Sequence, residues 1–235
     1  MSNSCYNGSI NLDTCQKKGG GDIMNIFLTL LSGIGWMIVY EECIRLGFRD
    51  KTYSMPFFAL GLNFAWEFLN FFGEIMFNWH GPMVGMTLIQ TAVNGFWAGL
   101  DIIILITYFK YGKKEWPKNA KEIWFTPWSI LGIICCFALQ IVFIVEFDGV
   151  LAAQYSAFIQ NLIMSILFIG LYIKRGSMEG QSLLLAVAKW IGTLAPTILF
   201  GFIEYNALVI VFGLFCSVFD LIYIWLLLQH KKQIF

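Results

Sequence analysis

Carboxylic acids and side-chain amides recur at helical spacing within a segment that is otherwise apolar and rich in phenylalanine. The members follow one another at intervals of four, three and four residues: Asn63, Glu67, Asn70 and Glu74. Because an α-helix turns by about 100° per residue, these side chains fall within an arc of about 60° and form one polar stripe. Ionisable groups are costly in apolar surroundings and mark function by default, so this stripe predicts a functional site.

Two further apolar segments carry polar residues at similar spacing. One stripe consists of Gln90, Asn94, Trp97 and Asp101, and the other of Gly213, Ser217 and Asp220. We expect the three polar faces to converge in the interior of a helical bundle, since none of them suits a lipid-facing position. Glu67 lies near the middle of its segment and Asp220 near the middle of the last one, so the two acids could lie within about one helical turn in height.

A buried carboxylic acid favours its neutral form and can therefore donate a proton at neutral pH. This makes Glu67 the candidate proton donor. The alternative is a structural polar network in which Asn63 and Asn70 satisfy Glu67. Aromatic rings near these acids could stabilise a cation through their quadrupoles, and the candidates are Trp66, Trp97 and Tyr223. Lys189 is also within an apolar segment, but its long side chain can snorkel towards water.

The elements that carry these stripes are membrane-spanning helices. Hydrophobic residues make up 58% of the 235 residues and charged residues 13%, and the mean hydropathy is +0.71, which is typical of an integral membrane protein. Because the net charge is zero, the chain has no overall positive charge that would attract nucleic acid. Seven segments are long and apolar enough to span a bilayer: Ile23–Tyr40, Met55–Phe77, Met83–Phe109, Pro127–Phe147, Leu151–Ile173, Ser182–Ile203 and Ala207–Leu228.

We therefore predict an all-α fold, an integral membrane bundle of seven transmembrane helices. Residues 1–22 form a polar, flexible N-terminal tail, residues 23–228 the transmembrane domain and residues 229–235 a short basic C-terminal tail. Twelve Lys and Arg residues flank the spans on one side and two on the other, which predicts an outside or lumenal N-terminus and a cytoplasmic C-terminus. The protein would lie in the endoplasmic reticulum membrane if its source is eukaryotic. Cys5 and Cys15 could pair or remain free thiols, and Asn7 begins a glycosylation sequon.

Metal and cofactor chemistry has no support in the sequence. No His and Cys set has the spacing of metal ligands, and no Gly-rich phosphate loop follows a strand. Aspartate-rich motifs that bind magnesium diphosphate are also absent. We therefore expect neither a metal nor a cofactor.

Several motifs resemble those of the integral-membrane terpene cyclases of fungal meroterpenoid and indole-diterpene pathways, of the pyripyropene and terretonin type. The likeness is strongest in the second span and the loop before it, in the fifth loop and in the seventh span. It rests on Gly35-Trp36, Tyr40, Asp50-Lys51-Thr52-Tyr53, Met55, Asn63-Phe64-Ala65-Trp66-Glu67-Phe68, Lys110, Glu115-Trp116, Arg175-Gly176-Ser177, Gly180, Ser182, Asp220 and Tyr223.

The resemblance implies that a Glu in the second span and an Asp in the last drive cyclisation, and these fall on Glu67 and Asp220. It further implies protonation of an epoxide or terminal alkene on a prenyl chain, ring closure through a cation cascade and loss of a proton. Asp220 would be a second acid beside Glu67 or the terminal base. The resemblance implies no role for Asp101, which is a candidate only because of its place in a polar stripe.

The implied partners are a prenylated aromatic or lactone substrate, often an epoxide, together with membrane lipid and with a prenyltransferase and an epoxidase that supply the substrate. The alternative is a proton- or cation-coupled small-molecule transporter, because chains of acids across a membrane also serve as proton relays. That alternative requires a continuous polar path, and the segment from Met55 to Leu60 is apolar.

Overall fold

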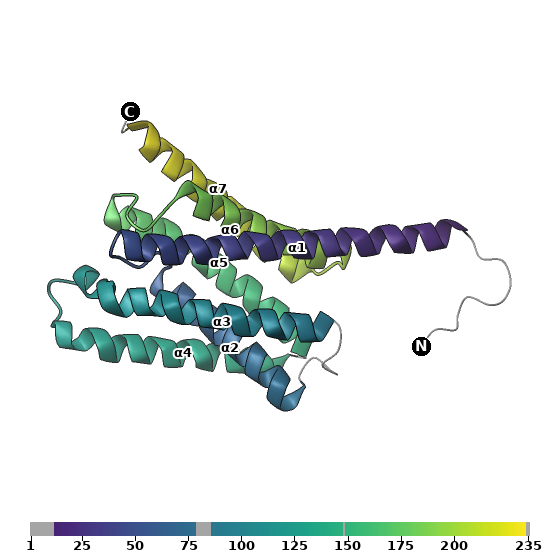
Figure 1. Cartoon of the computed structure of the whole chain (residues 1–235), viewed down its shortest axis with the longest axis horizontal. Helices are drawn as coiled ribbons and strands as arrows, with labels where there is room; N and C mark the ends of the chain where they lie inside the picture. The colour runs from purple at the N-terminus through teal and green to yellow at the C-terminus, as the bar shows by residue number, and fades with distance from the viewer. Residues whose placement is uncertain (1–11, 79–85, 148, 234–235) are drawn as a thin grey trace.

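The computed structural model describes residues 12–78, 86–147 and 149–233, and these residues form helices joined by short connections (Figure 1). The α-helices in these ranges are α1 (Leu12–Arg49), α2 (Phe57–Phe77), α3 (Met86–Tyr111), α4 (Phe125–Glu146), α5 (Gly149–Arg175), α6 (Leu183–Pro196) and α7 (Ala207–Gln233). Two short 3₁₀ turns, η1 (Gly112–Glu115) and η2 (Glu122–Trp124), connect α3 to α4, and a π-helical turn, η3 (Thr197–Ile203), extends α6. Each expected apolar segment therefore lies within or overlaps a helix, and the all-α prediction is confirmed.

Six stretches of the described chain are long and apolar enough to cross a membrane. They are Ile23–Arg49, Leu88–Glu115, Glu122–Glu146, Gly149–Arg175, Leu183–Ile203 and Ala207–Lys232. The protein is therefore a multi-pass membrane protein. The remaining helix, α2, has 21 residues, but its two Asn and two Glu side chains lower its hydropathy.

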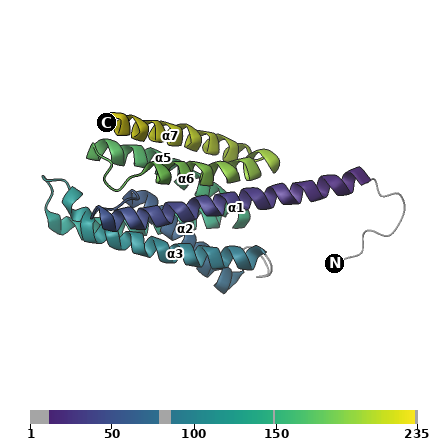
Figure 2. The same ribbon diagram turned by 45° about the horizontal axis from the view of Figure 1, so that its top comes forward.

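The helices pack as a ring around a common core. α1 contacts α3 and α6, α2 contacts α3 and α5, and α7 contacts α5 and α6, while α4 packs against α2 and α5. In two views α5, α6 and α7 lie on one side and α2 and α3 on the other, with α1 along the boundary between the two groups (Figures 1 and 2). Side chains from six of these helices meet in the largest buried cluster, which includes Tyr40, Ile104, Phe168 and Tyr223.

Small residues allow α1 and α6 to approach closely. A Cβ atom on Gly35 would lie 2.9 Å from the backbone of Ala188 and of Gly192, a distance too short for any side chain. Close contacts of this type are a common means of association between membrane helices, because lipid provides no hydrophobic driving force. The contact fixes the height of α6 relative to α1, and with it the depth of Lys189, which lies between these two α6 residues.

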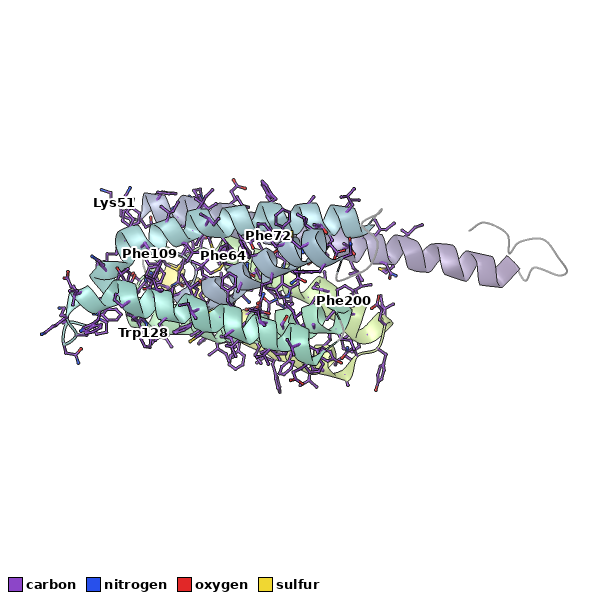
Figure 3. All side chains as sticks on the ribbon, turned by 90° about the horizontal axis from the view of Figure 1, so that it is seen from below. Lys51, Phe64, Phe72, Phe109, Trp128 and Phe200 are labelled. Carbon is purple, nitrogen blue, oxygen red and sulfur yellow. The ribbon has the colours of Figure 1, made fainter. Side chains whose placement is uncertain are left out.

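The connections that follow α1, α3 and α5 lie at the same end of the bundle as the C-terminus, opposite the N-terminal end of α1 (Figure 1). The side chains of Lys51, Phe109 and Trp128 also lie towards this end, and that of Phe200 lies towards the other (Figure 3). Lys and Arg occupy the last turns of α1, α3, α5 and α7. These basic residues therefore gather at one end of the bundle, called the basic end below. From Leu12 the backbone of the predicted tail is helical, whereas Cys5, Asn7 and the side chain of Cys15 lie outside the described residues.

Candidate active site

Asn63 on α2 is the centre of a buried hydrogen-bond network that extends over five helices. Its amide nitrogen donates to the hydroxyl of Tyr40 on α1 at 2.6 Å and to Oδ2 of Asp101 on α3 at 2.9 Å. Gln160 on α5 donates to the Asn63 carbonyl oxygen at 3.4 Å and accepts from Gln140 on α4 at 2.7 Å. The polar stripes of α2 and α3 therefore face each other inside the bundle, as the sequence predicts.

Glu67 lies one turn after Asn63 on the same face of α2 and is 3% exposed. Its carboxyl group interacts electrostatically with Asp101, which is 0% exposed. With the Asn94 amide turned so that its nitrogen faces α2, Asn94 donates to Oε2 of Glu67 at 3.3 Å. The second oxygen of Asp101 has no hydrogen-bond partner among the described residues. Two acids and two amides thus form a compact, water-shielded group between α2 and α3.

Asp220 has a different environment from the one expected. Both of its carboxylate oxygens accept from the Lys189 ammonium, at 2.8 and 3.0 Å, and the same ammonium donates to the Ser165 hydroxyl at 2.7 Å. Lys189 is 0% exposed, so it does not snorkel to water as its position in the sequence allows. The acid that interacts with Glu67 is Asp101, while Asp220 belongs to an ion pair between α5, α6 and α7.

The other predicted support residues differ in their contacts. Trp97 stacks on Tyr40 with ring centroids 5.9 Å apart, which brings an aromatic face to the edge of the Asn63 network. Trp66 donates to the backbone carbonyl of Ala153 at 3.0 Å and so ties α2 to α5.

Three further predicted support residues either form hydrogen bonds with groups other than Glu67 or are only partly buried. Asn70 donates to the Trp66 carbonyl at 2.8 Å, and Tyr223 donates to Gln181 at 2.8 Å. Neither hydrogen bond is made to Glu67, and Ser217 on α7 is only partly buried. Among the described residues, no three His, Cys, Asp or Glu side chains gather as metal ligands would.

The loop motifs meet at the basic end of the bundle. The Glu115 carboxylate accepts from Arg175 at 2.6 and 3.0 Å, from Thr52 at 3.1 Å and from Tyr53 at 3.0 Å. The Arg175 guanidinium also lies over the Tyr53 ring, 4.7 Å from its centroid. Burial raises the pKa of the Tyr53 hydroxyl, which therefore stays protonated and donates to Glu115. These contacts join the connections after α1, α3 and α5, which enclose this end of the bundle.

The family of the chain follows from a comparison of sequences. The sequence model of the Pyr4-like transmembrane terpene cyclases matches residues 22–233, which include every site described above. This chain belongs to that family. It is therefore a membrane terpene cyclase, and the transporter considered as an alternative has no support from the family.

Similar proteins from several fungi are also named terpene cyclases. The terpene cyclase pyr4 of Aspergillus fumigatus is 26% identical over 216 residues, which cover 87% of this chain and 86% of the relative. The terpene cyclase penB of Penicillium crustosum is 31% identical over 179 residues, 73% of this chain and 67% of the relative. The Pyr4-family terpene cyclase mfmH of Annulohypoxylon moriforme is 27% identical over 181 residues, 76% of this chain and 71% of the relative. No solved structure is significantly similar to the chain.

Sequence reasoning missed two groups of residues in this terpene cyclase. Gln140 and Gln160 extend the Asn63 network onto α4 and α5. Gln140 is the one side-chain amide of α4, and Gln160 stands beside Asn161 in a long apolar segment, so amides within apolar segments are the signal that could have identified both. Lys189 is expected from its sequence position to snorkel, although it lies seven residues inside its helix from the Ser182 cap. Its partner Asp220 belongs to another helix, so no spacing rule connects the two.

Proposed function

We propose that this terpene cyclase starts the reaction by donating a proton from Glu67 to an epoxide oxygen or a terminal alkene of a prenyl chain. With an epoxide, the proton bonds to the oxygen, the carbon–oxygen bond breaks and a carbocation forms. Neighbouring double bonds then attack the cation in turn and close rings, and a base finally removes a proton from carbon to give an alkene. The substrate and product are isomers, so the reaction needs no oxidant, reductant or metal.

The observation that carries the proposal is the pairing of Glu67 with Asp101 in a shielded site. Two neighbouring carboxyl groups in such surroundings do not both ionise, so at least one proton remains on the pair. Of the two acids, Asp101 accepts a hydrogen bond from the Asn63 amide, and an N–H donor of this kind pairs with an acceptor oxygen. We assign the retained proton to Glu67, in line with the role that the sequence analysis gives it. Trp97 and Tyr40 offer aromatic faces beside this site for the cation that follows.

The substrate class in this proposal is a prenylated aromatic or lactone compound carrying an epoxide. A prenyltransferase would attach the chain and an epoxidase would oxidise it, and both enzymes act before the cyclase. Such a lipophilic substrate can enter from the bilayer, because no charged group has to cross the hydrocarbon region.

We further propose seven spans, with the N-terminus lumenal and the C-terminus cytoplasmic, in the endoplasmic reticulum membrane. Support comes from α2, whose 21 residues extend about 31 Å at 1.5 Å per residue, enough to cross the bilayer core. Because α1 and α3 both end at the basic end, α2 must return the chain to the opposite end between them. Glycosylation reporters inserted at Asn119 and at Tyr205 test this topology, since modification is expected at Tyr205 and not at Asn119.

Membrane fractions that contain wild type or Glu67→Gln test the proposed reaction. Epoxyfarnesyl and epoxygeranylgeranyl aromatic compounds are supplied, and products are read by mass spectrometry. We expect the wild type to form a cyclic isomer of unchanged mass and Glu67→Gln to lose it by about 100-fold or more, because the amide cannot donate an acidic proton. Glu146→Gln is the matched control, since Glu146 is an exposed acid at the end of α4. Equal turnover in Glu67→Gln and wild type would refute the role of Glu67.

A further inference from the structure

Lys189 is a fully buried cation whose hydrogen bonds are all accounted for. An ammonium group has three N–H donors. Two acceptors are the oxygens of Asp220, at 2.8 and 3.0 Å, and the third is the Ser165 hydroxyl at 2.7 Å. Because the acceptors come from α5 and α7 while Lys189 belongs to α6, the ammonium is fixed by three helices.

The ion pair gives Asp220 a counter-ion, which Glu67 does not have among the contacts described above. Protonation of Asp220 would leave the Lys189 ammonium buried without a counter-ion, which is far more costly than the intact pair. The groups around Glu67 are instead a second acid and an amide. The two acids that the sequence analysis treats as alternatives for one role thus have opposite kinds of partner, a cation for Asp220 and a second acid for Glu67.

We propose that Lys189 is a positioning residue that holds Asp220 as an oriented carboxylate and so makes it the proton acceptor that ends the cyclisation. The inference rests on the proposed function and assigns separate roles to its two acids. Asp220 removes a proton from the carbon next to the last cation, and the electron pair of that C–H bond becomes the new double bond. Glu67 is then ionised and Asp220 neutral. Because a neutral Asp220 leaves the Lys189 ammonium without its counter-ion, Asp220 releases the proton after the reaction, and the return of one proton to Glu67 restores the starting state.

The chain offers variants that separate this role from a structural one. Lys189→Met leaves a buried carboxylate without a partner, whereas the double variant Lys189→Met with Asp220→Asn removes both charges at nearly constant volume. Replacing a complete buried ion pair in this way is often neutral for stability, while removing one partner is destabilising. Lys189→Arg keeps the positive charge and is the conservative variant.

The experiment measures folded protein in detergent by gel filtration and thermal unfolding, and measures cyclic products and their alkene isomers by mass spectrometry. We expect the double variant to recover the stability that Lys189→Met loses while its turnover remains about 100-fold or more below wild type, because the acceptor is absent. Lys189→Arg should retain measurable cyclisation, with a changed ratio of alkene isomers because the carboxylate is shifted.

Three outcomes would overturn the inference. Wild-type turnover in the double variant would show that the pair only stabilises the fold, and failure of the double variant to fold while Lys189→Arg folds would assign it the same structural role. Loss of all product in folded Lys189→Arg would show that charge alone does not maintain the acceptor. A wild type without cyclic product would instead refute the proposed function itself, which the Glu67→Gln comparison tests independently.

Discussion

Asn63 and Asp101 join α2 to α3 through a hydrogen bond of 2.9 Å that is shielded from water. The same amide nitrogen also reaches the Tyr40 hydroxyl at 2.6 Å, so one side chain connects three helices beside Glu67. Asn63 therefore supports the donor site indirectly. It holds Asp101 next to Glu67, whereas its own hydrogen bonds to the described residues go to Tyr40, Asp101 and Gln160.

Replacement of Asn63 by Ala should lower both stability and turnover. The change leaves Tyr40 and Asp101 without their shared donor in a buried site, which costs about 1–3 kcal/mol for each unsatisfied group. Turnover should fall by about 10-fold or more, because the Asp101 carboxylate loses its orientation beside Glu67. Thermal unfolding in detergent and the cyclisation assay measure the two effects. Asn119→Ala, at an exposed loop position, is the control and should match wild type in both.

Gly35→Ala should disrupt the contact between α1 and α6. The added Cβ would lie 2.9 Å from the backbone of α6, and backbone cannot move aside as a flexible side chain can. We expect a loss of about 1–3 kcal/mol, typical of overpacking. Gly33→Ala is a matched control on the same helix, because nothing lies within 4 Å of the position that its Cβ would occupy. Since Ala favours the helix over Gly by about 1 kcal/mol, the control should be neutral or stabilised in thermal unfolding.

Helix periodicity allowed the helices and the Glu67 stripe to be predicted because both are properties of a single segment. Asn63, Glu67 and Asp101 came together as expected. The polar face of a membrane helix is unfavourable against lipid, so the polar faces of neighbouring helices pack against each other. The pairing of Asp220 with Lys189 could not be predicted, because it depends on the depth at which α6 packs against α1 and α7. Likewise, the convergence of Thr52, Glu115 and Arg175 depends on which loops share an end of the bundle.

Arg175→Lys should destabilise the basic end of the bundle although it keeps the charge. The guanidinium donates twice to Glu115, donates to the Tyr53 carbonyl at 2.8 Å and covers the Tyr53 ring, and an ammonium cannot reproduce this geometry. We expect a loss of about 1.5–3 kcal/mol in thermal unfolding, the range for hydrogen bonds to charged groups. Arg45→Lys is the comparison. The Arg45 side chain is 48% exposed, and ion pairs of such exposed side chains, here with Glu42, usually contribute little to stability. Equal losses in the two variants would contradict the special role of Arg175.

Asp50 should make the basic end sensitive to acid. Arg49 donates to its carboxylate and the Gly180 amide donates at 2.8 Å, and these hydrogen bonds hold the pKa of Asp50 below its ordinary value. Because the folded-state pKa is lower than the unfolded one, the stabilisation is complete above the unfolded value of about 3.9 and is lost as the pH falls through the folded value. Asp50→Asn should therefore unfold at a lower temperature than wild type at pH 7.

The difference between Asp50→Asn and wild type should narrow as the pH falls below about 4, because the wild-type carboxyl then also becomes neutral. Thermal unfolding in detergent between pH 3 and pH 7 measures it. Glu122→Gln is the control, since Glu122 is an exposed acid in η2 at the same end of the bundle. A constant difference across this pH range would show that the Asp50→Asn substitution is unfavourable for a reason other than the missing charge.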